Sequence, residues 1–368
     1  MTSFRPAPSL PVLAVVLLLA LTSLSLPSLR SAPPPDVSTW LQPVPASAVF
    51  QDPDYNIWCG SAVVGSDGQV HLFYSRWPRR LGHLAWVTHS EIARAVAPSP
   101  LGPFRHVEVV LPARGPDFWD GHCTHNPTVL KHEGKYYLYY MGNVGDGRAM
   151  SDRLNFTHRN HQRIGVAVAD RPEGPWMRLD RPVLDVDPRS EAPDSLVVTN
   201  PSVTLRPDGT VLMIYKAVGQ QKPLPFGGPV VHLAATARSP LGPFTKHSRR
   251  IFTREGATFP AEDPFIWHDG SRYLGIVKDM GGHFTGRGVS LALFVSDDGL
   301  DWSPAPRPLV STLHLPHRDG RVQTLQKLER PQLLLIDGRP VVLYCAAVDT
   351  PDLNGSFNVA IPLAPPAP

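Results

Sequence analysis

An acidic residue stands directly before a strand-like run at two places in the chain. The pattern Glu-x-Pro begins at Glu262 and again at Glu329. Carboxyl groups that share one cleft can donate and accept protons, and two charged neighbours raise each other's pKa. The pattern therefore predicts a site of general acid and base chemistry, with Glu262 as the first candidate for the acid.

The elements that position these acids follow from an internal repeat. Each copy has a polar start, a short apolar run, a Gly-containing turn and a second run of aromatic or β-branched residues. The copies occupy 60–74, 126–140, 200–215, 263–277 and 330–344. Asp-Gly and Glu-Gly at the turns supply the positive φ that tight β-hairpins need.

A second motif lies between the hairpins. It is a strand followed by a turn with Ser or Asp, then Gly, then an aromatic residue, and it occurs in 90–104, 163–176, 232–244 and 289–302. Each period of hairpin and motif thus predicts about four antiparallel strands, which is one blade of a β-propeller.

Five periods predict an all-β fold, a single five-bladed β-propeller over 51–368. We expect the last strand, within 355–363, to join the first blade and close the ring, which removes an exposed edge. A β-sandwich whose hairpins are similar by chance is the alternative. The 42 prolines favour short strands and loops over long helices.

The N-terminus has the features of an export signal. Arg5 precedes an apolar run that begins near Leu10, and small residues up to Ala32 resemble a cleavage site. Residues 1–32 are therefore predicted to be a signal peptide and 33–50 a proline-rich lead-in, and we expect a secreted or periplasmic protein. An uncleaved N-terminal anchor is the alternative, because no charge lies between Arg5 and Arg30.

Cysteine content and charge add two expectations. Export permits disulfides, and of Cys59, Cys123 and Cys345 at least one must stay unpaired within the chain. A Cys59–Cys123 disulfide and buried free thiols are both open. The net charge of +3, without a Lys/Arg run, argues against a nucleic-acid partner.

In a propeller the inner strand of each blade begins near the axis, so the residues at the five strand starts ring a central funnel. These starts carry Trp58-Cys59-Gly60, His125-Asn126, Thr199-Asn200, Glu262-Asp263 and Glu329-Arg330. Carboxylates with aromatic neighbours suit a carbohydrate, because aromatic faces stack on its rings. We therefore predict a carbohydrate substrate and, as its binding residues, Trp58, His125, Asn126, Asn200, Asp263 and Arg330. Polar caps of strand ends that serve only the fold are the alternative.

These features resemble a known group of enzymes. The five-blade pattern, the motif Ser-x-Asp-Gly-x-x-Trp from Ser296 to Trp302 and Glu-x-Pro at Glu262 are similar to glycoside hydrolase family 43 and its relatives in families 32, 62, 117 and 130. The resemblance covers essentially the whole mature chain and implies a glycosidase. It implies an Asp base on blade one, an Asp that tunes the acid on blade three and the acid on blade four. Glu262 matches the acid, but Gly60 and Asn200 stand where the two aspartates are expected, so the base position is non-standard.

Other carboxylates are candidates for the missing ones. Asp54 lies just before the first inner strand and Asp120 just before the second, and either would serve as base or nucleophile if its loop folds over the funnel. Glu329 on the neighbouring blade would share the funnel with Glu262 and raise one pKa toward the value that an acid needs. We expect no cofactor; an axial divalent cation bound with the help of a histidine such as His125 is a weaker alternative.

The sequence thus predicts a secreted glycoside hydrolase that cleaves an oligo- or polysaccharide by carboxylate catalysis in the funnel. A glycan-binding propeller without catalysis is one alternative, motivated by Gly60 and Asn200. A phosphate-dependent glycoside phosphorylase is another, and it would need a cationic cluster, for which Arg330, Arg76 and His125 are the nearest candidates. No membrane contact is expected beyond the N-terminal anchor.

Overall fold

Short apolar strands joined by glycine-containing turns build the fold of this chain. The computed structural model describes residues 1–3, 5 and 33–366, so the predicted signal peptide lies almost entirely outside the described residues. From Pro34 onward the chain forms one compact unit. None of the described residues belongs to a helix that is long and apolar enough to cross a membrane.

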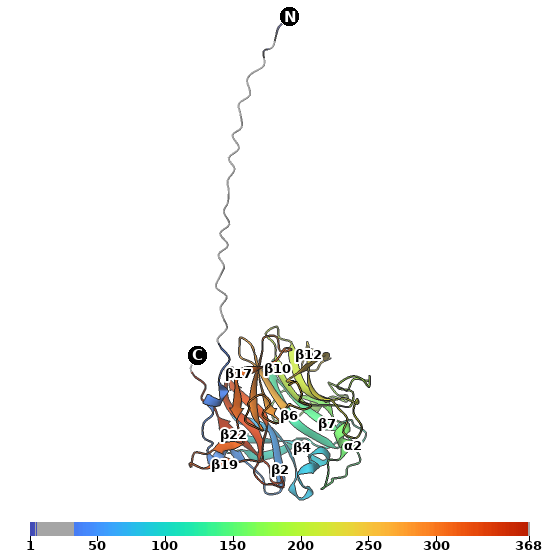
Figure 1. Ribbon diagram of the computed structural model, residues 1–368, viewed down its shortest axis with the longest axis vertical. Coiled ribbons are helices and arrows are strands. Elements are labelled where there is room, and N and C mark those ends of the chain that lie inside the picture. Colours follow the sequence, from blue (N-terminus) through green and yellow to red (C-terminus); the bar gives the residue numbers. More distant parts are fainter. Residues whose placement is uncertain (4, 6–32, 367–368) are drawn as a thin grey trace. The chain divides into compact units, whose positions relative to one another are not determined.

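The unit contains five four-stranded antiparallel sheets, which are the blades of a propeller (Figure 1). Blade one consists of β2 (Tyr55–Val64), β3 (Val70–Pro78), β4 (Glu91–Ala97) and β5 (Arg105–Leu111), and blade two of β6 (Cys123–His132), β7 (Lys135–Asn143), β8 (Arg163–Ala169) and β9 (Met177–Arg178). Blade three consists of β10 (Val197–Leu205), β11 (Val211–Val218), β12 (Val230–Ala237) and β13 (Thr245–Ile251), and blade four of β14 (Ala261–His268), β15 (Tyr273–Asp279), β16 (Ser290–Ser296) and β17 (Ser303–Ser311). Blade five consists of β20 (Lys327–Ile336), β21 (Arg339–Val348), β22 (Phe357–Pro362) and β1 (Val49–Phe50). The predicted five-bladed all-β propeller is confirmed.

The remaining elements are short. A small hairpin precedes blade five and consists of β18 (His314–Pro316) and β19 (Val322–Thr324). The helices are the 3₁₀ turns η1 (Val37–Trp40), η2 (Ala46–Ala48), η3 (Arg79–Leu81) and η4 (His83–Ala85) and the α-helices α1 (Trp86–His89) and α2 (Phe156–Asn160).

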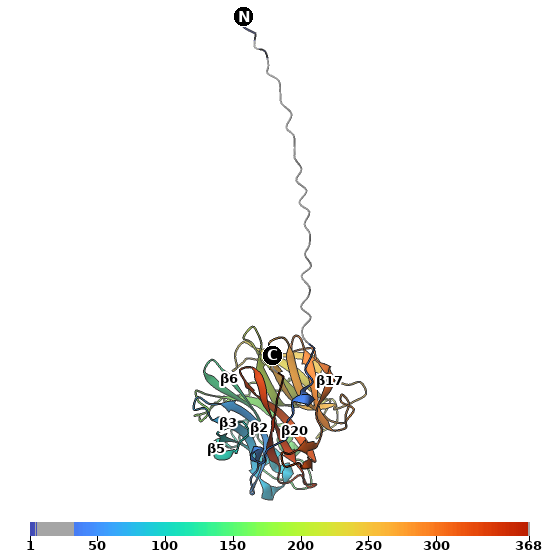
Figure 2. The same cartoon turned by 90° about the vertical axis from the view of Figure 1, so that its left-hand side faces the viewer.

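The inner strands surround the axis. Each inner strand contacts that of the next blade, in the order β2, β6, β10, β14 and β20, and β20 contacts β2 again. Figure 2 shows β2 and β20, which are far apart in sequence, side by side. The hairpin turns follow the predicted chemistry: Glu133 and Asp337 have φ of 49° and 50°, and the glycine after each has φ of 75°.

The ring closes differently from our expectation. β22, the last strand, does not join blade one; it pairs with β21 of its own blade and with β1 from the N-terminal segment, where Val49 faces Val359. The N-terminal strand thus supplies the outer strand of the last blade, which covers the edge of β22. Val44 and Phe50 of this segment are buried in the same apolar cluster as Val359, so part of 33–50 packs into the propeller.

The three cysteines are free and buried. Burial raises the pKa of the Cys59 and Cys345 thiols well above the usual range and that of Cys123 to about 12. Of the two alternatives that the sequence left open, the structure has the buried free thiols.

Candidate active site on the propeller axis

The five inner strands share a backbone feature near the axis. Each has one residue in the left-handed region, with φ between 53° and 56°, and these residues are Cys59, Asn126, Asn200, Asp263 and Arg330. At each of them the pairing with the second strand of the blade shifts register, which marks a β-bulge. We call these five residues the axial ring.

Hydrogen bonds run around the axial ring from blade to blade. The Cys59 thiol donates to Asn126 Oδ1 at 2.7 Å, and Asn126 Nδ2 donates to Asn200 Oδ1 at 2.5 Å. Asn200 Nδ2 and Arg330 Nη1 both donate to Asp263 Oδ1, at 2.7 and 3.4 Å. All five side chains are buried, so the axial ring is a polar plug held together by hydrogen bonds between the blades. Arg330 Nε and Nη2 are the atoms of the ring that have no hydrogen-bond partner among the described residues.

The axial ring corrects one sequence assignment. In blade one the equivalent of Asn200 is Cys59 and not Gly60, because Cys59 has the left-handed conformation and Gly60 stands where the later blades have proline. A Cβ on Gly60 would lie 2.9 Å from Asn358 Nδ2 and Leu72 Cδ1, so this glycine allows close packing of blade five. The axial ring also holds the Arg330 guanidinium, whose positive charge opposes a cation on the axis.

A cavity of about 150 Å³ lies at the starts of the inner strands. The residues just before the axial ring contribute to it, together with residues of neighbouring loops and second strands. Its lining consists of Trp58, Trp77, His83, Trp86, His125, Asn126, Gln162, Asn200, Lys216, Glu262, Asp263, Lys327, Glu329 and Arg330. The structure thus brings together Glu262, Glu329 and all six predicted binding residues, and we call this space the axial cavity.

Glu262 lies between two lysines. Its carboxylate contacts Lys216 Nζ at 2.6 Å and Lys278 Nζ at 3.5 Å, and its side chain is 17% exposed. Burial by itself raises the pKa of Glu262, but the charges of the two lysines outweigh burial and lower that pKa to about 2. The prediction that a like-charged neighbour raises the pKa of one glutamate of the pair is not met at Glu262, because the lysines beside it lower its pKa.

Glu329 has an equivalent place on blade five. It contacts Lys278 Nζ in a close ion pair and Lys327 Nζ at 3.5 Å. Because Lys278 contacts both glutamates, their facing oxygens lie no more than about 6 Å from one another. This upper limit lies below the roughly 6.5–9.5 Å separation of inverting glycosidases.

A carboxyl group with a raised pKa also lines the axial cavity, namely that of Asp263. Burial and the charges of Glu262 and Glu329 raise the pKa of Asp263 to about 6, although Arg330 acts in the opposite direction. Asp263 therefore titrates close to neutral pH, within the axial ring.

Aromatic side chains form the other wall of the axial cavity. Trp86 stacks on His125 with ring centres 5.0 Å apart, and Trp58 packs edge-on against His83. Burial and the charge of Arg330 hold the pKa of His125 well below its usual range, and its Nδ1 lies 2.7 Å from Ser90 Oγ. His125 is thus a neutral side chain beside flat rings, an arrangement that suits a sugar hydroxyl and the apolar face of its ring.

Two predicted catalytic residues lie elsewhere. Asp54 is exposed just before β2 and does not line the axial cavity. Asp120 is fully buried, where its carboxylate contacts Arg114 at 2.6 Å, Tyr140 Oη at 2.7 Å and Arg178 at 3.3 Å. Neither loop folds over the funnel: the first leaves Asp54 in solvent, and the second directs Asp120 into an ion-pair cluster.

Sequence reasoning missed the lysines. Lys216 lies on β11 opposite Thr199, and Lys278 lies on β15 opposite Glu262. Lysine is rarely buried without a partner, so a lysine within the apolar second strand of a hairpin was a usable signal. Arg76, which the sequence offered as a candidate for phosphate binding, lies outside the axial cavity and pairs with Glu91 at 2.9 Å.

Among the described residues, one group of potential metal ligands lies outside the axial cavity, namely Asp67, His71 and Glu173. Arg94 Nη1 lies 3.0 Å from His71 Nδ1. Because arginine only donates, Nδ1 accepts and the proton sits on Nε2, which lies 3.2 Å from Asp67 Oδ1. His71 therefore has no lone pair for a metal in this arrangement.

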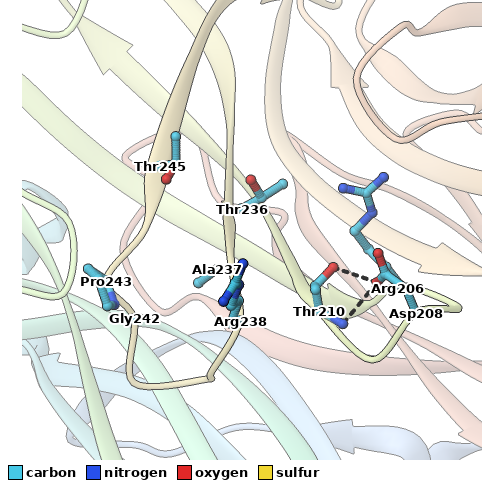
Figure 3. A pocket seen from close by; sticks show the side chains of 9 residues that line it. All are labelled: Arg206, Asp208, Thr210, Thr236, Ala237, Arg238, Gly242, Pro243 and Thr245. Carbon is cyan, nitrogen blue, oxygen red and sulfur yellow. Dashed lines mark hydrogen bonds between the residues drawn. The ribbon is translucent and has the colours of Figure 1, made fainter.

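A larger cavity, of about 420 Å³, lies at the edge of blade three (Figure 3). It contains Arg206 and Arg238 but one carboxylate, Asp208, which accepts hydrogen bonds from the backbone N and the hydroxyl of Thr210 at 3.0 and 2.6 Å. That carboxylate closes its own turn, so this cavity offers no pair of carboxylates.

Comparison with known proteins identifies the fold class. No protein-family model and no curated protein matches the chain. Solved structures do match. A thermostable family-43 glycoside hydrolase has 14% identity and a TM-score of 0.59 over 85% of this chain and 92% of its own. A family 117 glycoside hydrolase from the marine bacterium Zobellia galactanivorans has 15% identity and a TM-score of 0.58 over 88% and 89%. A GH43_1 enzyme from Xanthomonas citri, complexed with xylotriose, has 17% identity and a TM-score of 0.54 over 87% and 90%.

These likenesses confirm the predicted resemblance to the family 43-like five-bladed propellers, at the level of the fold. Identities of this size carry no residue roles from one chain to another, so the chemistry has to come from the axial cavity itself.

Proposed function

We propose that this chain is a glycoside hydrolase that cleaves a terminal sugar residue in the axial cavity. The observation that carries the proposal is the pair Glu262 and Glu329, whose facing oxygens lie within about 6 Å of each other beside three tryptophans. The cavity of about 150 Å³ is smaller than the roughly 300–1,000 Å³ that drug-sized ligands occupy. A single sugar ring is therefore the proposed occupant, with the rest of the substrate outside.

The two glutamates receive different roles. Lys216 and Lys278 keep Glu262 ionised, so we assign it the nucleophile rather than the acid of the family pattern. Glu329, the other carboxyl group of the pair, is then assigned the proton donor, although its ion pairs with Lys278 and Lys327 also favour the charged form. Glu262 attacks the anomeric carbon while the glycosidic C–O bond breaks and Glu329 gives its proton to the leaving oxygen. A water molecule, deprotonated by Glu329, next attacks the same carbon, forms the C–O bond of the product and releases Glu262.

The resemblance to xylotriose-binding and other glycoside hydrolases supports a carbohydrate substrate. The apolar N-terminal run, followed by small residues that resemble a cleavage site, supports secretion or export to a periplasm.

The roles of nucleophile and proton donor can be distinguished by measuring each variant on glycosides with different leaving groups. Glu262→Gln should lower kcat/KM about 10³-fold or more on every cleaved glycoside, because the nucleophile is needed whatever leaves. Glu329→Gln should lower it about 10²–10⁴-fold on an alkyl glycoside but much less on a dinitrophenyl glycoside, whose leaving group needs no proton. Asp170→Asn removes an exposed carboxylate and serves as the control with unchanged kinetics.

The first product also tests the assignment. A retaining reaction releases the sugar with the anomeric configuration of the substrate, which NMR records before mutarotation. An inverted product would contradict the nucleophile role of Glu262, and equal losses for both leaving groups in Glu329→Gln would contradict the acid role of Glu329.

A glycan-binding propeller without catalysis is the second candidate. The observation that favours it is that lysines already pair with both carboxylates, an arrangement that needs no chemistry to be stable. Glycans that bind to the wild type with no detectable turnover, and with affinity unchanged in Glu262→Gln, would establish this candidate in place of the hydrolase.

A further inference from the structure

Positive charge exceeds negative charge around the axial cavity. Its lining contains the cations Lys216, Lys327 and Arg330 and the carboxyl groups Glu262, Asp263 and Glu329. Lys278 lies behind the lining in contact with both glutamates and adds a fourth cation. Since a positive surrounding favours the charged form of a carboxyl group, the lowered pKa of Glu262 agrees with this excess.

Lys327 is the cation with the weakest partner. Lys216 is held at 2.6 Å by Glu262, and Arg330 belongs to the axial ring. Lys327 Nζ is 3.5 Å from Glu329 and 5.8 Å from the centre of the Trp58 ring, and its side chain is 27% exposed. An ammonium group carries three N–H donors, so Lys327 can offer donors to a ligand without losing this contact.

Other donors in the lining also lack acceptors. Gln162 Nε2 is buried and has no hydrogen-bond partner among the described residues, and the same holds for Arg330 Nη2. A buried donor without a partner is costly unless a ligand or water supplies an acceptor. A ligand rich in acceptor oxygens would therefore match the lining better than a neutral sugar alone.

We propose that the axial cavity takes an oxyanion next to Lys327, either the carboxylate of an acidic sugar ring or an inorganic phosphate. In the first case the substrate of the proposed hydrolase is a uronic acid glycoside. In the second the phosphate oxygen, and not water, takes the sugar from the enzyme, so that the new C–O bond yields a sugar phosphate. Both cases rest on the proposed function for turnover, but the binding of the anion does not.

Binding is tested first, by calorimetry on the full chain with glucuronate, glucose and inorganic phosphate. We expect glucuronate or phosphate to bind at least tenfold more tightly than glucose, and Lys327→Gln to weaken that anion at least tenfold while changing glucose less than threefold. Lys135→Gln, at an exposed ion pair, is the matched lysine control. Thermal unfolding of each variant checks that the fold is intact. Equal affinities for glucose and both anions, or an unchanged anion affinity in Lys327→Gln, would overturn the proposal.

Turnover then distinguishes the two sources of the oxyanion. Faster cleavage of a nitrophenyl uronide than of the matching neutral glycoside, with a preference that Lys327→Gln removes, identifies the acidic sugar. Turnover that needs phosphate and yields a sugar 1-phosphate identifies phosphate. If an anion binds through Lys327 but nothing is cleaved, the proposed hydrolase fails while the anion site stands.

Discussion

The five inner strands have a cavity at each end, and the two cavities differ in kind. At the strand starts lies the axial cavity, about 150 Å³ in volume and lined by charged and aromatic side chains. At the strand ends lies a space of about 630 Å³ whose lining is mostly Val, Leu, Ile, Phe and Trp. The axial ring lies between them along each strand. The larger space has no carboxylate pair in its lining. A larger cavity volume therefore does not identify the candidate active site.

The difference follows from what burial costs. A buried charge is tolerated when an opposite charge and hydrogen bonds satisfy it, and at the strand starts Lys216, Lys278, Glu262 and Glu329 satisfy one another. Beyond the axial ring the strands turn to side chains such as Val129 and Leu333, whose burial is favourable by itself. Each inner strand thus passes from a charged environment to an apolar one within a few residues.

The largest expected effect on stability comes from a substitution in the axial ring, which lies between the two cavities. Arg330→Met removes the guanidinium that contacts Asp263 and leaves that carboxyl group buried without its cation. Removal of one partner from a buried pair costs about 3–5 kcal/mol, so we expect a loss of that size in the free energy of unfolding, measured by urea denaturation.

A surface pair provides the scale for this loss. Arg321→Met breaks an exposed pair with Asp319 and should cost about 0–1 kcal/mol. If the two variants lost similar amounts, the axial ring would not be a stabilising boundary.

The repeat allowed much of this arrangement to be predicted. Hairpin periodicity identified the strand starts, and with them Glu262, Glu329 and six further residues that line the axial cavity. It did not identify Lys278, because the partner of Glu262 across the hairpin depends on a bulge that shifts the register. It also gave no basis for excluding Asp54 and Asp120, whose loops lie outside the repeat. The sequence pattern placed the strands, whereas bulges and loops decided which charges meet.

The next effect concerns the pH dependence of the axial ring. The pKa of Asp263 is about 6 in the folded chain against 3.8 in the reference state. The folded chain therefore binds more protons than the unfolded one between these values, so the contribution of Asp263 to stability is present at low pH and is lost as the pH rises toward 6. Over pH 4.5–6 we expect a loss of about 1.5 kcal/mol relative to Asp263→Asn.

The pH range in which Asp263 affects stability differs from that of Glu262. The pKa of Glu262 is lowered from 4.5 to about 2, so the stability that Glu262 contributes is lost only as the pH falls below about 4.5. Urea denaturation of the wild type and Asp263→Asn at pH 4.5 and 6.5 measures the difference directly. Parallel changes in the two proteins would mean that Asp263 does not titrate in this range.

The smallest expected effect lies at the apolar end. Ile336 lines the apolar cavity at the strand ends and is 38% exposed. Surface substitutions away from special features usually change stability by less than about 0.5 kcal/mol. Ile336→Ser should therefore leave the free energy of unfolding within that range and leave glycan affinity and turnover within twofold. A marked change in glycan affinity would show that the apolar cavity takes part in binding. The contrast between the two ends would then be one between two subsites rather than between a site and a packed strand end.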